Sequence, residues 1–217
     1  MIELVQRLRS EGPDLSRVVL EAMYRDPFWT ARFGDRGRRF ADEDSDYHLR
    51  YLTRAVIAGD AKVMARYAVW LREVLATRGM CTRHLAENFL RLEEALLARG
   101  WPDAPVAAGY LEQACLALRY DHGPAAEVQA LESTAMSQGE YAEDPAVFLS
   151  YLADALALGN PATFIAHVKW TADWLASRGR QASEVRARLE GIARLLRENQ
   201  VSATARLYVD EARAAIP

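Results

Sequence analysis

The apolar residues of this chain recur at spacings of three and four, which is the pattern of amphipathic helices. The pattern is clearest in four runs, at residues 46–60, 61–79, 82–100 and 107–120. Glycines stand at positions 59, 79 and 100, where the first three runs end, as is common at helix C-termini. No window shows the sustained alternation that a half-buried strand requires. The sequence therefore predicts an all-α protein.

The chain also repeats itself at an offset of one hundred residues, since residues 43–79 align without a gap on residues 143–179. Identical residues stand at equivalent positions, among them Tyr51/Tyr151, Leu52/Leu152, Ala55/Ala155, Gly59/Gly159, Trp70/Trp170 and Gly79/Gly179. Self-similarity of this kind is the mark of a duplicated structural unit. We expect two tandem pseudo-symmetric helical bundles packed together, with Trp70 and Trp170 as core residues.

This reading divides the chain into four parts. They are N-terminal helices with an arginine- and aromatic-rich segment (1–45), a first helical repeat (46–118), a connector (119–145) and a second repeat (146–217).

Composition excludes several classes of protein. The net charge of −3 and the pI of 5.9 offer no general attraction to nucleic acid. The N-terminal stretch MIELVQRLRSEG has no long apolar run, so neither a signal peptide nor a membrane anchor is expected there. Two cysteines are too few for a disulfide scaffold. A cytoplasmic protein is expected.

The stretch RGMCTRH (78–84) is the first candidate site. The second copy of this stretch, RGRQASE (178–184), joins the same two predicted helices without cysteine or histidine. Phe148 likewise stands where the first copy has His48. The first copy therefore holds His48, Cys81 and His84 without needing them to fold, and a thiolate with imidazoles could bind a metal ion or haem.

A structural explanation of the same stretch stays open. Thr82 would be the N-cap of the next helix, Cys81 a small apolar residue before it, and His84 a half-exposed residue of its first turn. A single Cys-x-x-His pair lacks the second pair that a structural zinc site needs.

The segment 25–44 is the second candidate site. It combines rings with guanidinium groups, and its candidate ligand-binding residues are Trp29, Phe33, Arg36, Arg38 and Arg39. Such a set could bind a flat, carboxylate-bearing molecule or an acidic protein partner. Alternatively the rings only clamp a short helix, and the arginines pair with the acidic residues of 42–46.

The order of landmarks resembles the helical cap module found beside corrinoid-binding domains in methyltransferase subunits and cobalamin photoreceptors. The matching pieces are RAVIAGD (54–60), LATRG (75–79), LARGW (97–101) and VAAGYLEQA (106–114), within residues 50–118 and more faintly 150–214. Gly109-Tyr110 stands where such modules can carry a Glu-His pair facing cobalamin, and the sequence contains no Asp-x-His-x-x-Gly motif. The resemblance implies a duplicated cap that acts as a sensor or interaction domain.

No phosphate loop, GxSxG, HExxH or di-iron motif occurs in the sequence. We therefore expect a non-catalytic module that binds a small ligand or a protein partner in a regulatory role, with the cofactor unspecified. The alternative is a metal- or haem-dependent enzyme that uses His48, Cys81 and His84. A third alternative is a structural protein that forms a homodimer through its tryptophan-bearing faces.

Overall fold

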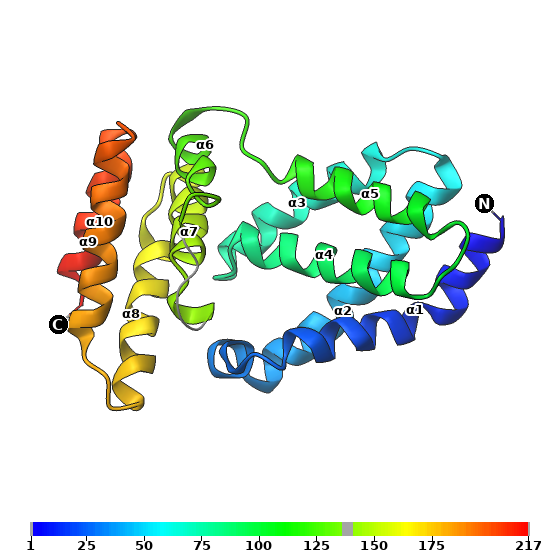
Figure 1. The fold of residues 1–217 in the computed structure, drawn as a ribbon, viewed down its shortest axis with the longest axis horizontal. Helices are drawn as coiled ribbons and strands as arrows, with labels where there is room; N and C mark the ends of the chain where they lie inside the picture. The colour runs from blue at the N-terminus through cyan, green and yellow to red at the C-terminus, as the bar shows by residue number, and fades with distance from the viewer. Residues whose placement is uncertain (1, 136–140, 217) are drawn as a thin grey trace. The chain divides into compact units, whose positions relative to one another are not determined.

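The computed structural model describes residues 2–135 and 141–216, and every regular element in these ranges is helical (Figure 1). The α-helices are α1 (Ile2–Met23), α2 (Pro27–Ala58), α3 (Lys62–Thr77), α4 (Thr82–Ala98), α5 (Ala104–Ala117), α6 (Gly123–Ala130), α7 (Pro145–Ala157), α8 (Ala162–Ser177), α9 (Ala182–Glu198) and α10 (Ala203–Ala214). A short 3-10 turn, η1 (Tyr141–Glu143), precedes α7. The all-α prediction is confirmed. None of the described helices combines the length and the apolar character needed to cross a membrane.

Local chemistry explains where α2 begins and ends. The carboxylate of Asp26 accepts the Phe28 N–H at 2.9 Å, and Pro27 occupies the first helical position, where a missing N–H costs nothing. The helix stops at Gly59, whose left-handed backbone (φ 61°) returns its N–H to carbonyls of the last turn. Gly34 (φ 60°) kinks the helix, because its backbone leaves the helical region inside the segment.

The helix bounds repeat at the offset found in the sequence. The ranges of α8 and α9 are those of α3 and α4 increased by one hundred. Gly59 and Gly159, which precede α3 and α8, have φ values of 61° and 63°. This agreement concerns helix bounds and backbone angles. That the two repeats superpose as whole bundles stays a prediction.

The chain forms two compact units. Unit 1 consists of residues 1–73 and 84–118, and unit 2 of residues 74–83 and 119–217. Residue 118, where the first repeat is expected to end, is the last residue of unit 1, whereas residues 74–83 of that expected repeat belong to unit 2. The expected boundary at 45/46 instead lies inside α2, because the N-terminal segment and the first repeat share that helix. Residues 136–140 of the expected connector lie outside the described residues.

Unit 1 is organised around α2, which packs against both α1 and α5. Two polar contacts tie α4 to its neighbours: the Asn88 amide lies 3.2 Å from the Met23 sulfur, and the Cys115 thiol lies 3.9 Å from the Ala86 carbonyl. In unit 2, α7 packs against α6 and α8, and α10 packs against α7, α8 and α9. The second copy of the RG-containing junction, residues 178–184, has mostly exposed residues.

The prediction that Trp70 is a core residue is wrong. Its side chain is 55% exposed, whereas the buried residues of α3 include Met64, Ala68, Leu71 and Leu75. Those four fall at helical spacing on one face, and Trp70 lies on a different one. Trp170 is half-buried. The Trp70 ring therefore lies on the surface of unit 1.

Candidate ligand-binding groove

The arginine–aromatic segment predicted as a ligand site uses its rings inside the protein. Trp29 is only 3% exposed, and its ring lies 5.4 Å from that of Phe28 and 5.8 Å from that of Phe33. The guanidinium of Arg36 lies over Phe40 at 5.4 Å, and that of Arg38 lies over Tyr24 at 5.0 Å.

The Trp29 ring is therefore too buried to stack on a ligand. Arg39 is exposed, and within the described residues neither it nor Arg36 or Arg38 forms a salt bridge with the acidic run 42–46. The clamp interpretation is thus supported for the rings and not for the arginines.

His84 joins this aromatic cluster. Its ring lies 5.0 Å from that of Trp29, 5.4 Å from that of Phe28 and 6.1 Å from that of Phe33. Only 1% of His84 is exposed, so the expectation of a half-exposed residue is wrong. The rings of α2 cover the imidazole, a contact between residues more than fifty positions apart that a local reading of the first turn cannot show.

The three metal candidates do not converge. Cys81 lies just before α4 and is 1% exposed, as expected for a small apolar residue, while the rings of His48 and His84 pack against different aromatic partners. Across residues 2–135 and 141–216, no group of three or more His, Cys, Asp or Glu side chains is placed to hold a metal ion.

His48 instead supports a tyrosine. Its Nδ1 shares a hydrogen bond of 2.8 Å with the Tyr67 hydroxyl, and its ring packs edge-on against Phe89. Burial lowers the pKa of His48 to about 3, so the imidazole is neutral at neutral pH. The pKa of Tyr67 is raised, first by burial and then by the Asp44 carboxylate and the neighbouring Tyr51 and Tyr47. Tyr67 therefore keeps its proton and is held in one orientation.

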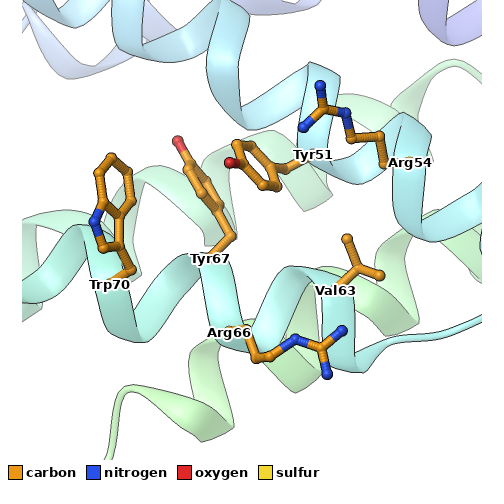
Figure 2. A pocket seen from close by; sticks show the side chains of 6 residues that line it. All are labelled: Tyr51, Arg54, Val63, Arg66, Tyr67 and Trp70. Atoms are coloured by element: carbon orange, nitrogen blue, oxygen red, sulfur yellow. The ribbon is translucent and has the colours of Figure 1, made fainter.

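Tyr67 forms the floor of an open groove between α2 and α3 (Figure 2). Its ring stacks on Tyr51 with centroids 4.0 Å apart and planes 12° from parallel, and Trp70 follows at 6.1 Å. The groove has a volume of about 320 Å³ and is lined by Tyr51, Arg54, Val63, Arg66, Tyr67 and Trp70. Figure 2 shows the three rings in a row, with Arg54 beside Tyr51.

The groove is basic. Arg54 extends from α2 and Arg66 from α3, and both are exposed. The Arg54 guanidinium lies over the Tyr51 ring at 5.1 Å. No salt bridge within the described residues involves either arginine. Arg54 therefore lies on an aromatic face, and Arg66 lines the same groove. Guanidinium groups of this kind can pair with an anion, and an aromatic face can stack on an apolar surface.

At the positions one hundred higher, unit 2 has a tyrosine–histidine pair with the same stacking geometry, and the charged residues differ. Tyr151 and His167 stack with centroids 4.0 Å apart and planes 12° from parallel, the values found for Tyr51 and Tyr67. At the offset of one hundred, however, Arg54 becomes Asp154 and Arg66 becomes Ala166. The two arginines therefore distinguish the first ring pair from the second.

The sequence did not indicate this groove, because Arg54 and Arg66 lie on two different helices and no motif links them. One signal was present: Val63, Arg66, Tyr67 and Trp70 have the spacing of a single helix face, and that face is not uniformly apolar. The resemblance to the cobalamin cap module stays a prediction. No protein-family model, curated protein or solved structure matches this chain.

Proposed function

We propose that the protein is a non-catalytic binding module whose groove between α2 and α3 accepts an anionic group beside an apolar surface. The observation that carries this proposal is the pairing of Arg54 and Arg66 with the Tyr51–Tyr67–Trp70 row in one groove. An occupant would place its charge near the guanidinium groups and its apolar part against the rings.

The groove is suited to binding rather than catalysis. Tyr67 is the titratable residue on its floor, and its raised pKa keeps the hydroxyl protonated at neutral pH. Tyr67 is hydrogen-bonded to the buried His48, whose pKa of about 3 is far from the value near 7 that suits a general base at neutral pH. The chemistry on offer is charge pairing, stacking and hydrogen-bond donation.

The test is a calorimetric titration with 2-naphthoate, which combines a flat ring and a carboxylate. We expect weak, saturable binding, and a loss of about fivefold in affinity in Arg66→Ala, since an exposed ion pair contributes up to roughly 1 kcal/mol. Trp70→Ala should weaken binding similarly while leaving the melting temperature almost unchanged, because the side chain is 55% exposed.

Two controls make the test specific. Arg9→Ala removes an exposed arginine of α1 that does not line the groove, so it should bind 2-naphthoate like the parent. The neutral amide 2-naphthamide should bind the parent more weakly than the acid. Equal binding of acid and amide, or equal losses in Arg9→Ala and Arg66→Ala, would refute the proposal.

A further inference from the structure

In unit 2, the two α7 residues one hundred positions after Tyr51 and Arg54 bind the chain's own backbone. The Tyr151 hydroxyl donates to the Gly79 carbonyl at 2.8 Å. The Arg83 N–H donates to the Ser150 hydroxyl at 3.0 Å. Residues 79–83, the junction between α3 and α4, therefore lie on α7 as a docked segment that belongs to unit 2.

Charge complementarity holds this segment in place. The Thr82 N–H and hydroxyl both donate to the Asp154 carboxylate at 2.6 Å, so an acid receives the positive N-terminal end of α4. Arg83 lies 3.7 Å from Asp144 and 3.9 Å from Glu132. The carboxylates of Asp154 and Asp144 thus face a helix start that carries Arg83, and the Thr82–Asp154 contact is buried, since Thr82 is 4% and Asp154 2% exposed.

The groove of unit 1 also has a tyrosine hydroxyl, but it has a basic residue where unit 2 has an acid. Tyr51 stands where unit 2 has Tyr151, and Arg54 stands where it has Asp154. A helix N-terminus cannot dock beside Arg54 without placing like charges together, which costs free energy. The same backbone geometry with arginine instead favours carboxylates and the carbonyl-rich C-terminal end of a helix.

We propose that the groove of unit 1 docks a helix junction of a partner protein that is acidic where residues 79–83 of this chain are basic. This inference rests on the proposed function and names the partner class. The composition of the groove fits a protein partner, because it combines exposed Trp70, Arg54 and Arg66 with half-buried Tyr51. Tryptophan, tyrosine and arginine are the residues that dominate protein–protein binding energy.

A second copy of this chain is the weaker occupant on charge grounds. The exposed junction 178–184 is the segment of unit 2 that corresponds to the docked one, and it carries Arg178 and Arg180. Arg180 is already paired with Glu143 and with Glu184, the one acid of this junction, so the junction offers no free carboxylate to Arg54 and Arg66. The Arg178 guanidinium also lies over the Trp174 ring at 3.9 Å, so it is held on its own unit.

The test is a reciprocal charge swap on the full chain, read by fluorescence polarisation. One labelled peptide has the sequence of residues 74–92 with Cys81→Ser, and the second adds Thr82→Asp and Arg83→Glu. The protein is compared with its Arg54→Asp/Arg66→Ala variant, which copies Asp154 and Ala166. We expect the parent to bind the acidic peptide about tenfold more tightly than the basic one, and the variant to reverse that preference.

A reversal cannot come from loss of folding, which would abolish both interactions. The inference is overturned if neither peptide binds the parent, or if the double variant keeps the parent's preference. If 2-naphthoate binding still depends on Arg66 in that case, the groove is a small-molecule site and the proposed function stands. Concentration-dependent self-association that requires Arg54 would also overturn the inference, because the occupant would be a second copy.

Discussion

At the scale of single residues, His48 shows how a residue suited to metal binding can serve another purpose. Its hydrogen bond to Tyr67 orients the ring on which Tyr51 stacks, so a buried imidazole helps to shape the groove. The second copy has Phe148 and His167 at these two positions, and their rings still meet at 4.7 Å. A ring contact therefore joins the residues at both pairs of positions, with histidine at position 48 in one pair and at position 167 in the other.

His48 should make unit 1 sensitive to acid. Its folded pKa of about 3 lies below the ordinary value of 6.5, so its contribution to stability is complete above pH 6.5 and is lost as the pH falls towards 3. His48→Phe, which copies Phe148, should remove this term. Between pH 7 and pH 4 we expect the parent to lose roughly 3 kcal/mol more stability than the variant does.

The measurement is denaturant unfolding of both proteins at pH 7, 5.5 and 4. Loss of the Tyr67 hydrogen bond lowers the variant's stability at every pH, so the informative quantity is the difference in slope with pH. Parallel pH dependences of the two proteins would show that the imidazole is already accessible to protons near pH 6.

At the scale of helices, the start of α4 shows a cap supplied by a distant residue. Thr82 was expected to be the N-cap, but it is the first residue of the helix and donates its N–H and hydroxyl to Asp154. The Tyr120 hydroxyl donates to the same carboxylate at 2.7 Å. One buried acid of α7 thus satisfies three donors from two other parts of unit 2.

Asp154→Ala should therefore be costly. The variant leaves three donors without their acceptor in a buried place, and we expect a loss of about 3–5 kcal/mol in the free energy of unfolding. Asp60→Ala is the matched control, because Asp60 is a local, partly exposed acid that accepts the Lys62 N–H at 2.8 Å. The control should lose only about 1 kcal/mol. Similar losses in urea melts of the two variants would contradict a special role for the distant cap.

At the scale of the whole molecule, the two units should respond to pH in opposite directions. Burial raises the pKa of Glu132 in unit 2 to about 8; Arg83 lowers it, Asp154 and Asp144 raise it, and a hydrogen bond from Ser150 lowers it. Its folded pKa lies above the ordinary 4.5, so its contribution to stability is complete below pH 4.5 and is lost as the pH rises towards 8. The stability contribution of His48 in unit 1 changes in the opposite direction, because it is lost as the pH falls.

Glu132→Gln keeps the shape of the side chain and removes its titration. We expect the parent to lose on the order of 3 kcal/mol more than the variant between pH 5 and pH 8. Hydrogen exchange followed by mass spectrometry assigns the change to a unit: the effect of Glu132→Gln should appear in α6 and α7. A change in protection confined to the peptides of α1 and α2 would contradict the assignment.

The sequence by itself determined the features that depend on neighbours along the chain. Helical periodicity predicted the helices, and the left-handed glycines 59, 79 and 100 predicted their ends, because both follow from local backbone energetics.

Only the tertiary structure decided which faces of those helices are covered. Trp70 is exposed and His84 buried because other helices cover one position and not the other, and the partner of Thr82 lies 72 residues away. Arg54 and Asp154 occupy equivalent positions, yet one lies at an open groove and the other beneath a docked segment. Contacts of that range depend on how the helices pack, and the pattern along a single helix does not contain them.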